Sequence, residues 1–202
     1  TMMEDKDNMW GPAHEIGHIN QFAINWPGCS ESSNNLFSNY VIFKFGKFCS
    51  RGNALSELNN YRVVQDQPFT LISGATHQGE NTELHMRMNW QLFVYFHRVL
   101  GDEQFWPRLF KLLRQTPPVE SNPGWSQLNF AEQACVAANL DLTDFFEMWG
   151  FFVPVDNVPY EQYGNWTLNV TPAMIADTKA RIAAMQQSGV DILEPMLYFE
   201  LQ

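Results

Sequence analysis

Apolar residues recur at helical spacing through most of the first 150 residues of the chain. The clearest run holds Leu84, Met88, Leu92, Tyr95 and Val99, which would share one face of a helix. The segments predicted to be helical in this central part are 81–100, 106–114, 129–139 and 143–150.

Capping signals set several of these boundaries. Asn81 or Thr82 can start the first helix and Gly101 can end it. Asn129 with Glu132 reads as a capping pair, because an amide oxygen and a carboxylate three residues apart can each accept a free N–H of a first turn. The chain is therefore expected to change direction at each of these positions.

The pattern changes after residue 150. Pro154 and Pro159 interrupt any helix, and the run 163–170 suggests one or two strands. A final helix is expected from Thr171-Pro172 to Gly189. The predicted fold is therefore mainly α, with a small β and loop element after residue 150.

The first 45 residues read as two helices joined by a tight turn. Gly11-Pro12 is a helix start, and Ile16, Ile19 and Ala23 would form its buried stripe. Pro27-Gly28 would end this helix, and Ser30 could cap a second one that carries Glu31 in its first turn.

Residues 46–80 have no convincing periodicity and are rich in Gly, Asn, Gln and Ser. A loop of this length is either functional or a surface Ω-loop. We interpret it as a substrate-contacting loop. With this loop included, the chain is expected to be one unit, with a lead at 1–8, a helical part at 9–150 and a loop, strand and helix part at 151–202.

The strongest chemical signal is His-Glu-Ile-Gly-His at residues 14–18. Side chains four apart on a helix lie on one face, about 6 Å apart along the axis, so His14 and His18 can bind one Zn²⁺. Glu15 can take a proton from a water at that metal. Glu31 is the nearest downstream carboxylate that could serve as the third ligand, which leaves one position open.

Other interpretations of this region remain open. His14 and His18 could be two surface histidines, and Cys29 could replace Glu31 as a ligand, although a carboxylate suits a catalytic zinc better. Asn35 is four residues beyond Glu31, on the same face of the expected helix, where its amide could hold a ligating histidine in one tautomer.

Three cysteines leave at least one thiol without a partner within this sequence. Cys29 and Cys49 could form a bridge. Cys135 lies between alanine and valine and is expected to be a small buried residue.

Four segments carry a resemblance to a known family: WGPAHEIGHINQ at 10–21, ESSNNLFS at 31–38, FWPRLF at 105–110 and NLDLTDFFEMWG at 139–150. Together they resemble the M60-like (enhancin-type) peptidases over roughly residues 9–185. These are gluzincins, so the resemblance implies zinc bound by His14, His18 and Glu31, with Glu15 as general base. Asn35 stands where related gluzincins often use an acid.

The resemblance also implies that the chain is the helical C-terminal part of a larger zincin-type catalytic domain. Members of the family place a β-sheet before the active-site helix, and only nine residues precede Trp10 here. The chain is expected to need upstream residues of its own full-length protein. The flank of the His14 helix that such a sheet would cover is expected to expose apolar surface.

Composition narrows the possible partners. A net charge of −10 and a pI near 4.8 argue against nucleic acid or an anionic membrane as the main partner. No apolar run approaches the roughly 18 residues of a membrane span. The resemblance implies a secreted, periplasmic or cell-surface setting.

The predicted function is a zinc-dependent endopeptidase, and the resemblance implies an O-glycosylated, mucin-type glycoprotein as substrate. The alternative is a glycan- or glycoprotein-binding module with a structural zinc site. Trp10 could wall the substrate cleft or pack under the helix entry, and His77 could contact substrate. The group that steadies the oxyanion stays open among Tyr40, Tyr61, Tyr95 and His77. The remaining histidines, His85 and His97, are expected to be structural.

Overall fold

The computed structural model describes residues 6–45, 67–72 and 84–185. Its fold is mainly α with one small hairpin after residue 150, as the sequence predicted. The elements are α1 (Lys6–Asn20), η1 (Gln21–Ile24), α2 (Asn35–Lys44), α4 (Leu84–Val94), η5 (Tyr95–Val99), α5 (Phe105–Gln115), α6 (Pro123–Ala138), α7 (Thr143–Met148), β1 (Val155–Glu161), β2 (Asn165–Val170) and α8 (Pro172–Ala184).

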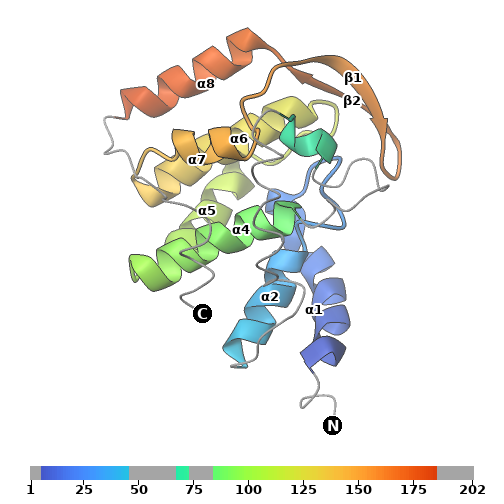
Figure 1. Ribbon diagram of the computed structural model, residues 1–202, viewed down its shortest axis with the longest axis vertical. Helices are drawn as coiled ribbons and strands as arrows, with labels where there is room; N and C mark the ends of the chain where they lie inside the picture. The colour runs from blue at the N-terminus through green and yellow to red at the C-terminus, as the bar shows by residue number, and fades with distance from the viewer. Residues whose placement is uncertain (1–5, 46–66, 73–83, 186–202) are drawn as a thin grey trace.

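The helices form two groups (Figure 1). The pair α1 and α2 lies side by side at one end, and α6 packs between α5 and α8 at the other. The strands β1 and β2 pair antiparallel, with Tyr160 opposite Trp166, and the hairpin runs along one edge of the molecule. Its tip therefore returns toward the segment that joins α1 to α2.

Aromatic side chains fill the core between the two groups. Phe69 and Phe151 have ring centroids 4.4 Å apart, and Phe130 packs against Trp26 at 5.8 Å. The buried indole N–H of Trp26 donates to Thr70 Oγ1 at 2.9 Å, so this polar group is satisfied inside the core. Residues 67–72 of the expected long loop thus belong partly to the core, and the rest of that loop lies outside the described residues.

Helix α6 begins earlier than the sequence suggested. Asn122 caps it by accepting a hydrogen bond from Trp125 N at 3.0 Å, and Pro123 occupies the first turn. Asn129 is inside the helix and donates to Thr116 O at 3.0 Å instead of capping. The predicted Asn129–Glu132 capping pair is therefore wrong, because a stronger start signal lies seven residues upstream.

Helix α1 also begins early, at Lys6, and contains Pro12 in its interior. Residues 6–8, assigned to the unstructured lead, are helical. Trp10 is buried and packs with Ile42 and Met86, and this packing extends the helix beyond the Gly11-Pro12 signal. At the other end of the chain, α8 ends at Ala184 and not at Gly189.

The apolar stripe predicted for α1 faces solvent. Ile16 is 60% exposed, Ile19 81% and Phe22, in η1, 69%, whereas Ala23 is buried as expected. The stripe prediction is wrong for the two isoleucines because α1 packs against α2 through its other side. The separate expectation that this flank of the His14 helix exposes apolar surface agrees with the structure.

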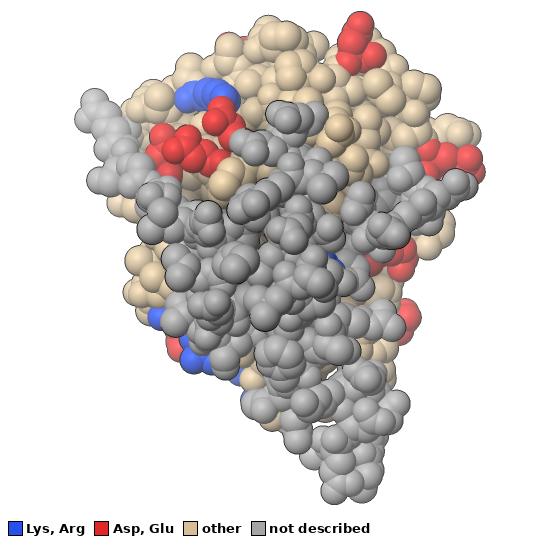
Figure 2. Space-filling view, in the orientation of Figure 1, with Lys and Arg blue, Asp and Glu red and all other residues tan. Residues whose placement is uncertain are grey.

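Figure 2 shows acidic side chains scattered around the margin of one face, with few basic ones. None of the helices within the described ranges is long and apolar enough to span a bilayer.

Candidate metal centre

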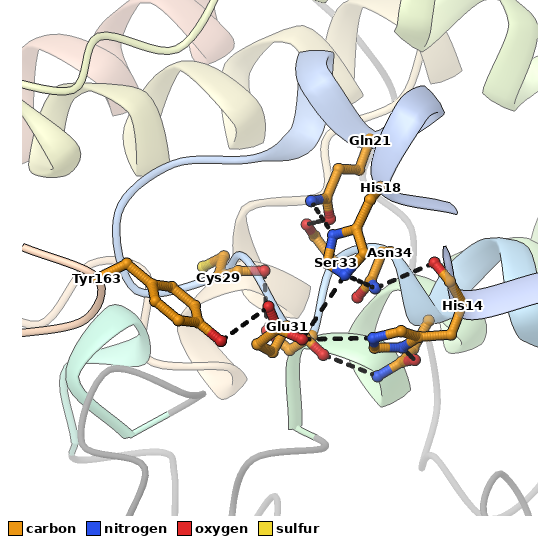
Figure 3. A network of polar contacts seen from close by, with 10 residues as sticks. His14, His18, Gln21, Cys29, Glu31, Ser33, Asn34 and Tyr163 are labelled. Carbon is orange, nitrogen blue, oxygen red and sulfur yellow. Dashed lines mark hydrogen bonds and ion pairs between the residues drawn. The ribbon is translucent and has the colours of Figure 1, made fainter. Parts of the chain in front are cut away.

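His14, His18 and Glu31 converge at the junction of α1 and α2 (Figure 3). One ligand atom from each lies within 4.8 Å of the others. His14 Nε2 lies 3.3 Å from Glu31 Oε2, and His18 Nε2 lies 3.7 Å from the same oxygen. The two imidazoles come from successive turns of α1, as their spacing predicted.

Glu31 lies in a run of tight turns and not in a helix. The backbone N–H groups of Ser32 and Ser33 both donate to Cys29 O, and α2 begins only at Asn35. The prediction that Ser30 caps a helix carrying Glu31 is therefore wrong. The turns fold the chain back on itself, which brings the Glu31 carboxylate to the face of α1 that bears the histidines.

Asn35 holds His14. Its Oδ1 lies 2.7 Å from His14 Nδ1, and its Nδ2 donates to Glu31 O at 3.0 Å. When Nδ1 carries the proton and donates it to the amide oxygen, Nε2 keeps its lone pair for a metal. Asn35 thus joins two of the three candidate ligands.

Gln21 occupies the corresponding place at His18, and sequence reasoning missed it. Its amide nitrogen lies 2.9 Å from His18 Nδ1, and its Oε1 accepts from Ser33 Oγ at 2.8 Å. A half-turn of this amide would present its oxygen to Nδ1–H. The spacing of three residues on adjoining helical turns was the available signal.

Asn34 contacts both histidine residues. Its Nδ2 lies 3.1 Å from His18 Nε2 and 3.3 Å from His14 O. The same amide thereby ties the turn that bears Glu31 to the helix that bears both histidines.

The β1–β2 hairpin braces the segment that precedes and carries Glu31. Tyr160 OH donates to Pro27 O at 2.8 Å, and Gly28 N donates to Gln162 Oε1 at 2.5 Å. Tyr163 OH donates to Glu31 Oε1 at 3.1 Å and reaches it from the side opposite the histidines (Figure 3). This bond to the carboxylate raises the pKa of the Tyr163 hydroxyl. The partners are 132 residues apart, so no local pattern could have revealed them.

The donor set fits a catalytic zinc. Two imidazole nitrogens and one carboxylate oxygen are the ligands of an open site, whereas a structural site usually has four protein ligands. Among the described residues, His14, His18 and Glu31 form the cluster able to hold a metal. Glu15 is exposed on α1, next to His14 in the chain.

Several residues considered from the sequence lie elsewhere. Trp10 is 6% exposed and belongs to the small core of α1, α2 and α4, so it packs under the helix and does not wall a cleft. Tyr40 packs beside Phe93, and Tyr95 is buried against Phe96. His77, Tyr61 and Cys49 lie outside the described residues.

The other histidines and cysteines have structural positions. His85 is fully buried beside Trp26 and Phe69, and burial lowers its pKa to about 3. His97 stacks on Phe93 with ring centroids 5.0 Å apart. Cys29 and Cys135 are buried, and burial raises the pKa of the Cys135 thiol to about 12.

A helix with two histidines four apart, and a carboxylate from the turn that follows, is the arrangement of side chains with which metallopeptidases hold their metal. The chain belongs to the Peptidase M60 family, enhancin and enhancin-like, whose family model matches residues 2–150.

Solved structures agree with this assignment. A metallopeptidase in complex with Tn antigen is 52% identical, with a TM-score of 0.83 over 94% of this chain and 35% of its own. A metallopeptidase from Bacteroides thetaiotaomicron is 51% identical, also with a TM-score of 0.83, over 94% of this chain and 32% of its own. A functionally unknown conserved protein from Bacillus anthracis, 22% identical with a TM-score of 0.61 over 95% of this chain and 33% of its own, shares the fold. The chain spans about a third of the length of these proteins.

Proposed function

We propose that this chain carries the active site of a zinc-dependent endopeptidase. The observation that supports this most directly is the convergence of His14, His18 and Glu31, with Glu15 beside His14 on α1. The Peptidase M60 family and the metallopeptidases of similar structure support the same reaction class.

In this proposal His14 Nε2, His18 Nε2 and one oxygen of Glu31 hold the zinc ion. When bound, zinc would polarise a water molecule and the scissile carbonyl. Asn35 and Gln21 fix the two imidazole rings through their Nδ1 atoms. Because both rings are held in this way, their Nε2 atoms stay directed at the carboxylate with little reorganisation.

Glu15 is the general base and then the general acid. Its carboxylate accepts a proton from water as the water oxygen attacks the carbonyl carbon of the peptide bond. The carbon–nitrogen bond then breaks, and Glu15 returns the proton to the leaving amine. The carboxylate is regenerated, so the cycle closes with no further reactant.

We further propose that the substrate is an O-glycosylated, mucin-type protein. The support is the similar metallopeptidase solved in complex with Tn antigen, at 52% identity. Such a substrate fits a secreted, periplasmic or cell-surface enzyme. Since the proteins of similar structure are about three times as long as this chain, we expect further residues of the full-length protein to assist substrate binding.

The test compares wild type with Glu15→Gln, each loaded with zinc, on an O-glycosylated mucin peptide and on the same peptide without sugar. Both chains are studied alone and extended upstream by roughly 100 residues, a typical fraction of a domain. Wild type should cleave the glycopeptide, faster in the extended form, and the variant should retain zinc without cleaving. Equal cleavage of the glycopeptide by wild type and by Glu15→Gln would overturn the mechanism. Binding of the glycopeptide without cleavage by wild type would indicate a binding module with a structural zinc.

A further inference from the structure

The tip of the β1–β2 hairpin brings an exposed phenol to the metal centre. Tyr163 is 76% exposed, yet its hydroxyl lies 3.1 Å from Glu31 Oε1. The other oxygen of the same carboxylate faces the two histidines. Tyr163 is therefore an exposed side chain in direct contact with a candidate ligand, on the side of Glu31 that faces away from the histidines.

The backbone at the tip is held in an uncommon conformation. Tyr163 has a φ of 49°, in the left-handed region that is unfavourable for a bulky side chain. The three residues between the strands are Gln162, Tyr163 and Gly164, and turn chemistry alone would favour Gly or Asn at the left-handed position. A tyrosine kept at such a position in contact with a site points to a role for its side chain.

The residues around Tyr163 fix the tip without using its hydroxyl. Gln162 is 3% exposed and accepts from Gly28 N, while Trp166 Nε1 donates to Gln162 O at 2.8 Å. Tyr160 anchors the strand to Pro27. Because these bonds hold the hairpin against the Glu31 segment, the phenol of Tyr163 is not needed as an anchor.

Building on the proposed function, we propose that Tyr163 is a catalytic residue that contacts the substrate. Its hydroxyl rotates from Glu31 to the oxygen of the scissile carbonyl and donates a hydrogen bond as negative charge develops there. No proton is transferred, because the phenol remains protonated throughout. A donor placed in advance at a developing oxyanion stabilises the transition state more than the ground state.

The alternative role for Tyr163 is to position Glu31 alone, and the two roles predict different measurements. A positioning residue would change zinc affinity when its hydroxyl is removed. A substrate-contacting donor would change kcat and the binding of a transition-state analogue, with zinc affinity preserved.

The hairpin itself offers a matched pair of variants. Tyr163→Phe removes the exposed hydroxyl, and Tyr160→Phe removes the buried hydroxyl that anchors the hairpin to Pro27. Tyr40→Phe, on α2 beside Phe93, controls for the loss of a phenol elsewhere. Circular dichroism checks that each variant is folded.

Three quantities are measured on each chain: the zinc Kd by competition with a chromophoric chelator, kcat and KM on an O-glycosylated peptide, and the Ki of a phosphinic peptide. For Tyr163→Phe we expect kcat to fall on the order of 100-fold and the phosphinic Ki to rise, with zinc Kd and KM changed by less than about threefold. Tyr160→Phe should instead weaken zinc binding.

Two results would overturn the assignment. One is a Tyr163→Phe enzyme with unchanged kcat and Ki, and the other is a zinc Kd that weakens by the same factor as kcat. Neither of these two results would contradict the proposed peptidase activity. A wild-type chain extended upstream by roughly 100 residues that binds zinc but neither cleaves the peptide nor binds the phosphinic inhibitor would instead refute the proposed function, and the role of Tyr163 with it.

Discussion

Gly17 of α1 lies directly against the backbone of Asn34 in the turn before α2. A Cβ at position 17 would stand 2.7 Å from Asn34 O, closer than side-chain carbons approach a carbonyl. The residue just before His18 must therefore be glycine for the turn with Glu31 to reach the histidines. We expect Gly17→Ala to destabilise the fold by about 1–3 kcal/mol, because backbone has to move. It should also weaken zinc binding.

Gly11 provides the matched control for this prediction. It lies on the same helix, is exposed, and an added Cβ would have nothing within 4 Å apart from its chain neighbours and the backbone of its own helix. Gly11→Ala should change the stability of α1 by less than about 1 kcal/mol, because the lower entropy of the unfolded chain is opposed by the contact of the new Cβ with the ring of Pro12. Urea unfolding and a zinc titration of both variants make the comparison. Similar behaviour of the two would mean that the close approach at Gly17 has no consequence.

Removal of Glu31, the third candidate ligand, should lower zinc affinity more than any of the other substitutions. Glu31→Ala deletes the carboxylate that faces both Nε2 atoms, so zinc affinity should fall by more than roughly 100-fold, beyond the usual effect of an outer partner. Glu120→Ala, at an exposed position before α6, removes the same charge elsewhere. Zinc retained by the Glu31 variant after dialysis against a mild chelator would exclude this residue as a ligand.

Asn35 tests the outer contacts of the site. Asn35→Ala removes the acceptor for His14 Nδ1–H, and zinc affinity or activity should fall about 10–100-fold. Asn35→Asp keeps an oxygen for His14 but loses the donor to Glu31 O, so its loss should be smaller. If the alanine variant binds zinc within about twofold of wild type, Asn35 is an ordinary helix residue.

His85 should make stability depend on pH. Burial lowers its folded pKa to about 3, from an ordinary value of 6.5. Between these values the unfolded chain binds a proton that the folded chain does not. The free energy of unfolding therefore keeps its full contribution from His85 above pH 6.5. As the pH falls from 6.5 to about 3, it decreases by about 1.4 kcal/mol per pH unit.

The matched variants are His85→Gln, which has no charge to gain, and His97→Gln at a partly exposed position. Denaturant unfolding from pH 7 to pH 4, with a chelator to exclude metal, should show a shallower pH dependence for His85→Gln than for wild type. An identical slope in the two proteins would contradict the assignment.

The sequence pattern predicted the features that are determined by residues close together in the chain. The i, i+4 spacing of His14 and His18 requires only α1, and Asn139 ends α6 with a φ of 54° as an asparagine readily does. The stripe of Ile16 and Ile19 failed because periodicity reveals an apolar face without showing what covers it. Glu31 was correctly placed near the histidines but on the wrong element, since tight turns have weaker signals than helices.

Whether a contact around the candidate ligands could be predicted depended on how far apart its two residues lie in the sequence. Asn35 could be proposed because it is four residues from Glu31, and Gln21 could have been, because it is three from His18. Tyr160, Gln162 and Tyr163 reach the site only through the hairpin, so their roles follow from tertiary structure.

This arrangement bears on the order in which a growing polypeptide acquires its metal centre. His14, His18 and Glu31 leave the ribosome before the hairpin that anchors Pro27 and Gly28, which emerges more than 120 residues later. A nascent chain that ends after α2 would hold the three ligands on an unbraced turn and release metal readily. Tight binding would develop only when synthesis has passed β2, so metal uptake would follow the folding of the hairpin and would not accompany the synthesis of the ligands themselves.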